Sequence, residues 1–149
     1  MRIGVLNGVN LDVLGRRDPT LYGSLTLAEL ESRIYRWSRD LECTTRCRQT
    51  NHEGQFVEWC HDALDWADGV IVNPGAWSHY SYAIRDAVEL FDVPVVEVHL
   101  SAIEEREEFR RHSVLEKLAS RRITGKGPEG YHEALGWLVA QVQTPQVGR

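Results

Sequence analysis

Short apolar runs alternate with amphipathic stretches along this chain, and this alternation constrains the fold more than any other feature. Apolar runs at residues 3–6, 70–72 and 93–100 are typical of buried strands, whereas residues 26–40 repeat apolar side chains at helical spacing. Strands and helices that alternate with short connections favour a parallel sheet. We therefore expect an α/β fold, a doubly wound parallel sheet with helices on both faces.

The alternation continues to the end of the chain. The further expected elements are a strand at 43–49, a helix capped by Asn51 with apolar positions at 56–67, a helix with apolar positions at 80–91, a strand at 119–124 and a last helix with apolar positions at 131–142. Five strands and their helices suit a flavodoxin-like sheet of order 2-1-3-4-5. Two arginines in the fifth strand predict an edge position, with an outer face that is solvated or covered by another subunit.

The composition indicates one globular domain, 1–149, with a frayed tail from about residue 143. Hydrophobic residues make up 42% and charged residues 26% of the chain, as in average globular proteins. No apolar run approaches the ~20 residues of a membrane span, and the N-terminus lacks a signal-peptide pattern. The net charge is −5 and the arginines form no basic stripe, so we expect a cytoplasmic protein without membrane or nucleic-acid partners.

The three cysteines do not predict a disulfide framework, because their number is odd and no C-x-x-C motif occurs. Cys43 and Cys47 share one face of a predicted strand, where buried free thiols are usual; a zinc site with His52 is the alternative. The sequence also lacks a phosphate loop, a dinucleotide fingerprint, a metal-binding helix motif and a G-x-S-x-G elbow. These absences argue against cofactor-dependent and serine-hydrolase chemistry, and they favour acid–base chemistry on a small polar anion.

A polar loop follows the first strand. Residues 7–23 read NGVNLDVLGRRDPTLYG and include Asn10, Arg17 and Tyr22. The loop lies at the carboxyl end of a strand, where open α/β sheets bind ligands. A cation within a few ångströms favours the phenolate form of a tyrosine, which then serves as a base. The alternative is a solvated loop whose glycines make turns and whose arginines face water.

Polar residues also follow the other strands at the same edge of the sheet: Asn51 and His52 after the second, Asn73 after the third, and His99 and Ser101 at the fourth. Their coincidence favours a binding site there. The same residue types also cap helices and make turns, which is the alternative.

The fourth strand carries two groups suited to proton transfer. Glu97 and His99 are two residues apart in a strand, so they project from the same face. A buried carboxylate beside an imidazole orients the ring and supports its protonated form, as a general acid requires. The backbone amides of Leu100 and Ser101 are suited to hold a carboxylate. The alternative is a core histidine satisfied by a salt bridge.

Two further segments carry candidate binding residues. NPGAWSHYSYAIRDA at 73–87 places His79 near a helix start and Asp86 seven residues later, on the same side. This arrangement suits the recognition of hydroxyl groups, and a cap followed by a solvated helix face is the alternative. Arg106 and Arg110 belong to the densest positive cluster, which by itself is typical of a solvated helix face.

Six segments in order resemble the type II 3-dehydroquinate dehydratases, or type II dehydroquinases, over nearly the whole chain. Besides 7–23 and 73–87, they are RQTNHEG at 48–54, VEVHLS at 96–101, REEFRRHS at 106–113 and GPEGYHEAL at 127–135. The resemblance implies a flavodoxin-like fold and a dodecamer of four trimers. It also implies reversible dehydration of 3-dehydroquinate to 3-dehydroshikimate through an enolate, without metal or coenzyme.

The resemblance implies a role for each candidate residue. Tyr22 matches the proton acceptor, Arg17 the residue that stabilises its phenolate, His99 the proton donor and Glu97 the partner of that histidine. Asn10 matches a residue that holds the enolate through a water. Arg106 matches an arginine associated with closure of a flexible lid, and Asp86 matches a residue that reaches into the site of a neighbouring subunit. The residues that match substrate-binding positions are Asn73, His79, Leu100, Ser101 and Arg110.

Some positions depart from the usual pattern of the family. These are Val9, Asp12, Ala102, Glu104, Glu105, Lys126 and the polar fifth strand. Glu104 and Glu105 lie within about a turn of Arg106 and Arg110, so we expect them to compete for these arginines. A catalytically silent homologue that binds a ligand or acts as a scaffold is the alternative function; the retained catalytic residues favour an active enzyme.

Overall fold

The computed structural model describes residues 1–143, and the tail expected to fray lies in residues 144–149, outside the described range. The strands are β1 (Arg2–Asn7), β2 (Thr44–Gln49), β3 (Gly69–Asn73), β4 (Val95–His99) and β5 (Arg121–Thr124). The α-helices are α1 (Pro19–Tyr22), α2 (Leu27–Asp40), α3 (Glu53–Leu64), α4 (Tyr82–Glu89) and α5 (Glu129–Gln143). Four 3-10 helices are η1 (Leu11–Arg16), η2 (Gly75–His79), η3 (Ile103–Glu105) and η4 (Glu108–Arg111).

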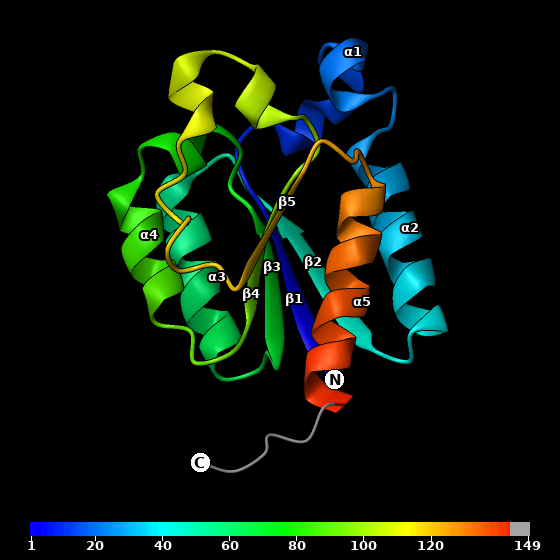
Figure 1. Ribbon diagram of the computed structural model, residues 1–149. Helices are drawn as coiled ribbons and strands as arrows, with labels where there is room; N and C mark the ends of the chain where they lie inside the picture. The colour runs from blue at the N-terminus through cyan, green and yellow to red at the C-terminus, as the bar shows by residue number, and fades with distance from the viewer. Residues whose placement is uncertain (144–149) are drawn as a thin grey trace.

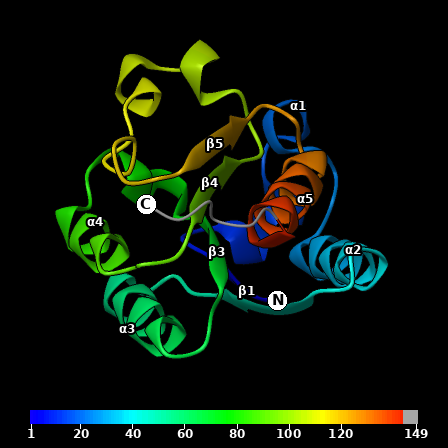
Figure 2. The same cartoon turned by 60° about the horizontal axis from the view of Figure 1, so that its bottom comes forward.

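The five strands form one parallel sheet in the order β2-β1-β3-β4-β5, which confirms the predicted flavodoxin-like topology. Helices α2 and α5 cover one face of the sheet and α3 and α4 cover the other (Figure 1). Figure 2 shows the same layers from another direction. Each face has its own apolar core; on the α2/α5 side Ile34 and Leu138 are fully buried, and on the α3/α4 side Phe56 and Ile84 are.

The helix boundaries follow local capping chemistry. The Thr26 hydroxyl accepts a hydrogen bond from the Glu29 backbone N–H at 3.2 Å, which satisfies a free donor at the start of α2. The prediction that Asn51 caps the next helix was wrong. His52 precedes α3, and the Asn51 side chain instead accepts from the backbone of Asn10 (2.8 Å) and donates to Asp12 (3.0 Å).

The segment expected as a loop after β1 is largely helical. Its first part, η1, buries Leu11 and Leu14 in the α2/α5 core. Its second part, α1, begins at a proline, and the Asp18 carboxylate before it accepts a hydrogen bond from the Thr20 backbone at 2.9 Å. These short turns lack the repeated apolar positions by which longer helices are recognised.

The third predicted helix begins later than its apolar pattern suggests. Tyr80 precedes α4 and is 61% exposed, so the prediction that it belongs to the buried face of this helix was wrong. The Ser81 hydroxyl caps the helix by accepting from the Ile84 N–H at 3.1 Å. Because His79 ends η2 and Asp86 lies on α4, the two do not share one helix face, which corrects that prediction.

β5 lies at an edge of the sheet, as predicted, but its arginines are not both solvated. Arg121 is exposed and donates to Glu133 of α5 at 2.6 Å. The Arg122 side chain is only 19% exposed.

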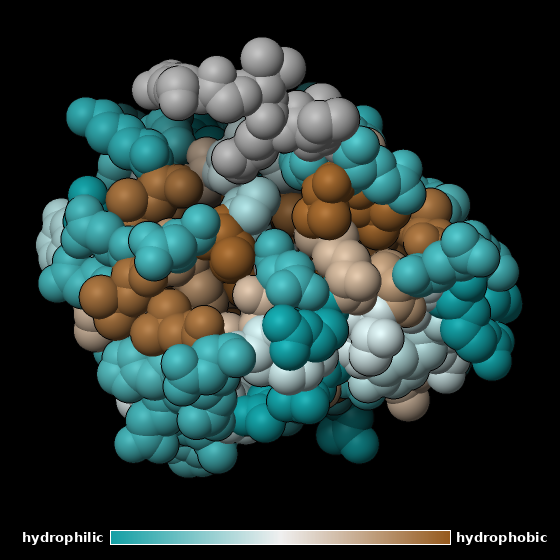
Figure 3. Space-filling model, turned by 90° about the horizontal axis from the view of Figure 1, so that it is seen from below, coloured by the Kyte–Doolittle hydropathy of each residue, from teal (hydrophilic) through white to brown (hydrophobic). Residues whose placement is uncertain are grey.

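None of the helices in residues 1–143 is long and apolar enough to cross a membrane. At the end of the molecule where the strands begin, hydrophobic residues form separate groups among hydrophilic ones (Figure 3).

Candidate active site

A pocket opens at the carboxyl end of the sheet, above β3 and β4. Nine of the twelve predicted site residues line it, contributed by the segments after β1, β3 and β4: Arg17, Tyr22, Asn73, His79, His99, Leu100, Ser101, Arg106 and Arg110. Leu11, Gly75, Ala76 and Ile103 complete the lining. Strands bring these segments together because parallel strands end at a common edge.

The Tyr22 hydroxyl accepts hydrogen bonds from two guanidinium groups. Arg17 Nη2 and Arg106 Nη1 each lie 2.6 Å from the oxygen, and the Arg17 guanidinium carbon lies 3.7 Å from the centre of the ring. Two cations therefore contact the same oxygen. The contact with Arg17 was expected; the contact with Arg106 was not, because 84 residues separate it from Tyr22.

Several positive charges meet at this end of the pocket. Burial lowers the pKa of Arg17; the Tyr22 oxygen opposes that change, and the like charges of Arg106 and Arg110 add to it. An arginine stays protonated even with such a shift, since its ordinary pKa is above 12. The pocket is therefore suited to an anion.

Glu97 and His99 form a buried pair on β4. His99 Nε2 donates to Glu97 Oε1 at 2.7 Å, and both side chains are almost completely shielded from solvent. The Ser113 hydroxyl donates to the same oxygen at 2.6 Å. Burial raises the pKa of Glu97, but the hydrogen bond and charge of His99, the Ser113 hydroxyl and the charge of Arg122 hold that pKa below its ordinary value. Sequence reasoning found the pair by strand geometry and missed Ser113, which no spacing indicates.

His79 lies beside this pair, with its ring centre 6.3 Å from that of His99. Its Nδ1 donates to the carbonyl of His112 at 2.7 Å, which leaves Nε2 as the nitrogen that can accept. Burial lowers the pKa of His79, and the charges of His99 and Arg110 lower it further, while the hydrogen bond to His112 opposes them. A neutral His79 at neutral pH follows.

Asn73 is held by a buried chain of hydrogen bonds. Its Nδ2 donates to the Tyr131 hydroxyl at 2.9 Å, and its Oδ1 accepts from the Gly75 backbone at 3.2 Å. The Tyr131 hydroxyl donates in turn to Asn7 Oδ1 at 2.7 Å. Burial raises the pKa of Tyr131, so it remains a neutral hydroxyl. The sequence marked Tyr131 only as an apolar position of the last helix.

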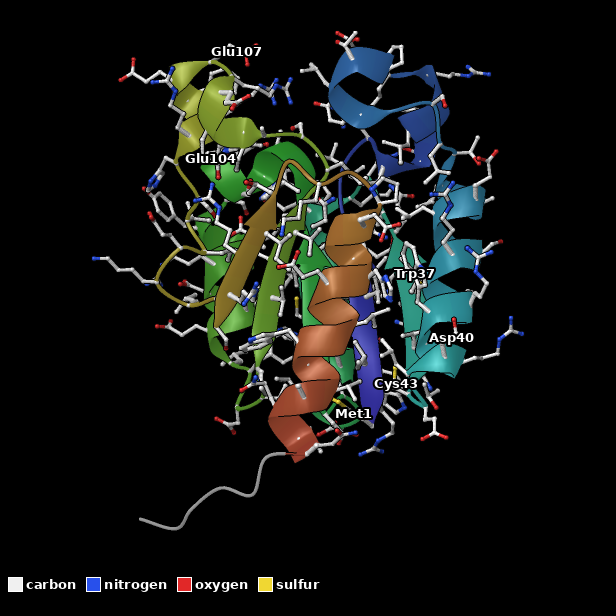
Figure 4. The ribbon with its side chains drawn as sticks, turned by 45° about the vertical axis from the view of Figure 1, so that its right-hand side comes forward. Met1, Trp37, Asp40, Cys43, Glu104 and Glu107 are labelled. Atoms are coloured by element: carbon white, nitrogen blue, oxygen red, sulfur yellow. The ribbon has the colours of Figure 1, made fainter. Side chains whose placement is uncertain are left out.

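The glutamate that pairs with the pocket arginines is Glu107. Its Oε2 lies 2.8 Å from Arg110 Nε and 3.8 Å from Arg106 Nε. Glu104 instead accepts from the hydroxyl of Thr124 on β5 at 2.8 Å, away from both arginines. Figure 4 shows Glu104 near the carboxyl end of β5 and Glu107 farther from the sheet, at the top of the view. The expectation that Glu104 and Glu105 compete for these arginines was therefore wrong, since within residues 1–143 neither forms an ion pair with Arg106 or Arg110.

Three predicted residues do not line the pocket. Glu97 lies behind His99, as described above. Asn10 has left-handed backbone geometry (φ 67°), and its backbone N–H donates to Asn51. Asp86 points to solvent, with its side chain 74% exposed and 3.6 Å from Arg85.

The thiols and acidic groups do not gather into a metal site within residues 1–143. Cys43, Cys47 and Cys60 are free thiols, and Cys43 and Cys47 do not form a cluster with His52, so the zinc alternative is not supported. Burial raises the pKa of Cys47 and of Cys60 to about 12, which keeps both protonated.

The family model for Dehydroquinase class II matches residues 1–139. The chain belongs to the class II dehydroquinase family. It is 48% identical to the 3-dehydroquinate dehydratase of Pelotomaculum thermopropionicum, covering 91% of this chain and 94% of that protein. The 3-dehydroquinate dehydratase of Pelobacter propionicus is 49% identical, over 90% of this chain and 91% of that protein.

Solved structures of the family share the fold. The crystal structure of type II dehydroquinase from Propionibacterium acnes has a TM-score of 0.91 and 45% sequence identity to this chain, over 93% of this chain and 96% of that one. The order of the five strands and the surrounding helices match type II dehydroquinase structures.

Proposed function

We propose that this protein is a 3-dehydroquinate dehydratase, a hydro-lyase that reversibly removes water from 3-dehydroquinate to give 3-dehydroshikimate. The observation that carries the proposal is the pairing of Tyr22 with two guanidinium groups in a pocket that also holds the His99–Glu97 pair. The names of the relatives support the same reaction.

Tyr22 is the proposed base. The proton to be removed lies next to a ketone, so its loss gives an enolate, and a base that is active near neutral pH can remove it. Arg17 and Arg106 stabilise the negative charge of the phenolate, each through a hydrogen bond of 2.6 Å. The positive charge around the pocket also favours the enolate, and Asn10 is proposed to help hold it through a water.

His99 is the proposed acid. Departure of the tertiary hydroxyl requires a proton, and the ionised Glu97 supports the protonated imidazole that supplies it. The substrate carboxylate is proposed to bind the backbone amides of Leu100 and Ser101 with Arg110, all of which line the pocket. Asn73 and His79 are proposed to bind the substrate hydroxyl groups.

The proposed assembly is a cytoplasmic dodecamer of four trimers. Asp86 supports an assembled site, because its exposed side chain lies outside its own pocket and is available to a neighbouring subunit. Sedimentation velocity of the purified protein measures the assembly directly.

The test is the absorbance of the conjugated enone product, measured with the parent protein and with Tyr22→Phe. We expect turnover by the parent and none by Tyr22→Phe, which loses only a hydroxyl, while calorimetry still detects substrate binding to the variant. A Tyr22→Phe variant with the parent rate would refute the role of the base. Binding without turnover by the parent would favour the silent homologue instead.

A further inference from the structure

Two polar residues of β5, Arg122 and Thr124, share one face of the sheet. Ile123 is 3% exposed and packs in the core under α2 and α5, so its neighbours Arg122 and Thr124 face the other side. The register between β4 and β5 pairs Glu97 with Arg122 and His99 with Thr124. Residues at one register position of neighbouring parallel strands project from the same face. Arg122 and Thr124 therefore lie alongside the His99–Glu97 pair.

Three buried polar atoms in this group have no hydrogen-bond partner in the described part of the chain: Glu97 Oε2, Arg122 Nε and Arg122 Nη2. The other Glu97 oxygen, Oε1, accepts from both His99 and Ser113. A buried carboxylate oxygen without a donor depends on nearby positive charge to remain ionised. The Arg122 guanidinium supplies such a charge through space.

Glu104 faces the same guanidinium from the solvent side. Its Oε1 lies 3.8 Å from Arg122 Nη2, and its carboxylate accepts from the Thr124 hydroxyl at 2.8 and 2.9 Å. The Glu104 side chain is 50% exposed, whereas Glu97 is fully buried. Arg122 thus stands between an outer and an inner carboxylate.

We propose that Arg122 is a positioning residue for the proton donor: its guanidinium keeps the Glu97 carboxylate ionised, and the outer Glu104 carboxylate offsets part of that positive charge. The proposal rests on the proposed function only for the role of His99. An ionised Glu97 accepts the His99 N–H and so fixes the orientation of the ring. Neither Arg122 nor Glu97 lines the pocket, so both act through His99.

Other charged groups face this pair and are left unchanged in the variants below. On η2, the His79 ring lies 6.3 Å from that of His99, and the charge of Arg110 on η4 acts on His79. Differences among the variants therefore report the β5 charge and its carboxylate partners.

Arg122→Met removes the charge and keeps most of the side-chain volume. In the full chain, 13C NMR of the Glu97 carboxyl carbon should show its titration about one pH unit higher than in the parent protein. Because Glu97 then becomes protonated at a higher pH, the acidic limb of the kcat–pH profile should move to higher pH, whereas KM should stay within about twofold because the pocket lining is intact. Arg122→Lys should restore the parent titration. Arg121→Met is the matched control, since Arg121 bonds to Glu133 of α5, and it should leave the titration unchanged.

Glu104→Gln tests the same idea with the opposite sign. Glutamine can still accept from Thr124, but it no longer offsets the Arg122 charge, so Glu97 should titrate at lower pH than in the parent. Adding Glu104→Gln to the Arg122→Met variant should lower the pH of the Glu97 titration much less than adding it to the parent protein does, because the effects of the two residues are coupled. A purely structural role would not shift the titration in opposite directions.

The proposal is overturned by a folded Arg122→Met protein whose Glu97 titrates as in the parent, or by Glu104→Gln that shifts it upward. If Arg122→Met does not fold, Glu104→Gln decides: a downward shift of the Glu97 titration supports the proposal, and an upward shift or no shift overturns it. Failure of the parent protein to form the enone would refute the proposed function instead, because the Glu97 titration requires no turnover.

Discussion

Replacement of Arg17 by glutamine should move the acidic limb of the kcat–pH profile to higher pH. Arg17 donates to the Tyr22 hydroxyl at 2.6 Å, and its guanidinium carbon lies 3.7 Å from the ring centre. A hydrogen bond to a charged group contributes about 1.5–3 kcal/mol, and about 1.4 kcal/mol corresponds to one pH unit. Tyr22 is only part-buried, so solvent screening favours the smaller value, a shift of about one unit.

The assay is the initial rate of enone formation at saturating 3-dehydroquinate across the pH range. Arg106→Gln should give a comparable shift, because its guanidinium lies at the same distance from the hydroxyl. Arg16→Gln is the control, since Arg16 is exposed and outside the pocket, and its profile should match the parent profile. An unchanged profile for Arg17→Gln with only a higher KM would assign Arg17 to substrate binding and refute the reasoning.

Three further outcomes are expected. Glu107→Gln should lower KM by about twofold with little change in kcat, because it frees Arg110 for an anionic substrate. The decrease in KM should become smaller in high salt, and a decrease that is equal at all salt concentrations would contradict this explanation. Mixed Asp86→Ala and Tyr22→Phe subunits should recover part of the activity after verified subunit exchange if sites are shared between subunits, and no recovery would count against a composite site. Tyr131→Phe should lower the free energy of unfolding by about 1–3 kcal/mol, because it leaves buried amide groups without partners; urea titration measures this, and unchanged stability would show that they find other partners.

The topology and half of the catalytic arrangement follow from local patterns. Alternation of strands and helices predicted the 2-1-3-4-5 sheet because each element is defined by a short-range repeat of apolar side chains. The two-residue period of a strand placed Glu97 and His99 on one face, and His99 Nε2 lies 2.7 Å from Glu97 Oε1. Both predictions depend on residues that are close in the chain.

Predictions in irregular segments were less reliable. The sequence could not show that Asn51 pairs with Asn10 instead of capping α3, or that residues 7–23 are largely helical. Short turns contain too few residues for a repeat to emerge, and an asparagine can satisfy several backbone and side-chain partners. The glutamate that pairs with Arg110 is Glu107, three residues away, and not the more distant Glu104 or Glu105.

By itself, the sequence determined the parallel sheet, the edge at which the polar residues gather and the pairing of Glu97 with His99. Only the tertiary structure decided that Arg106 reaches Tyr22 across 84 residues and that Arg122 faces the buried pair. The physical reason is the range of the forces involved. Backbone periodicity is set by neighbouring residues, whereas an ion pair forms between whichever charges the completed fold brings within a few ångströms.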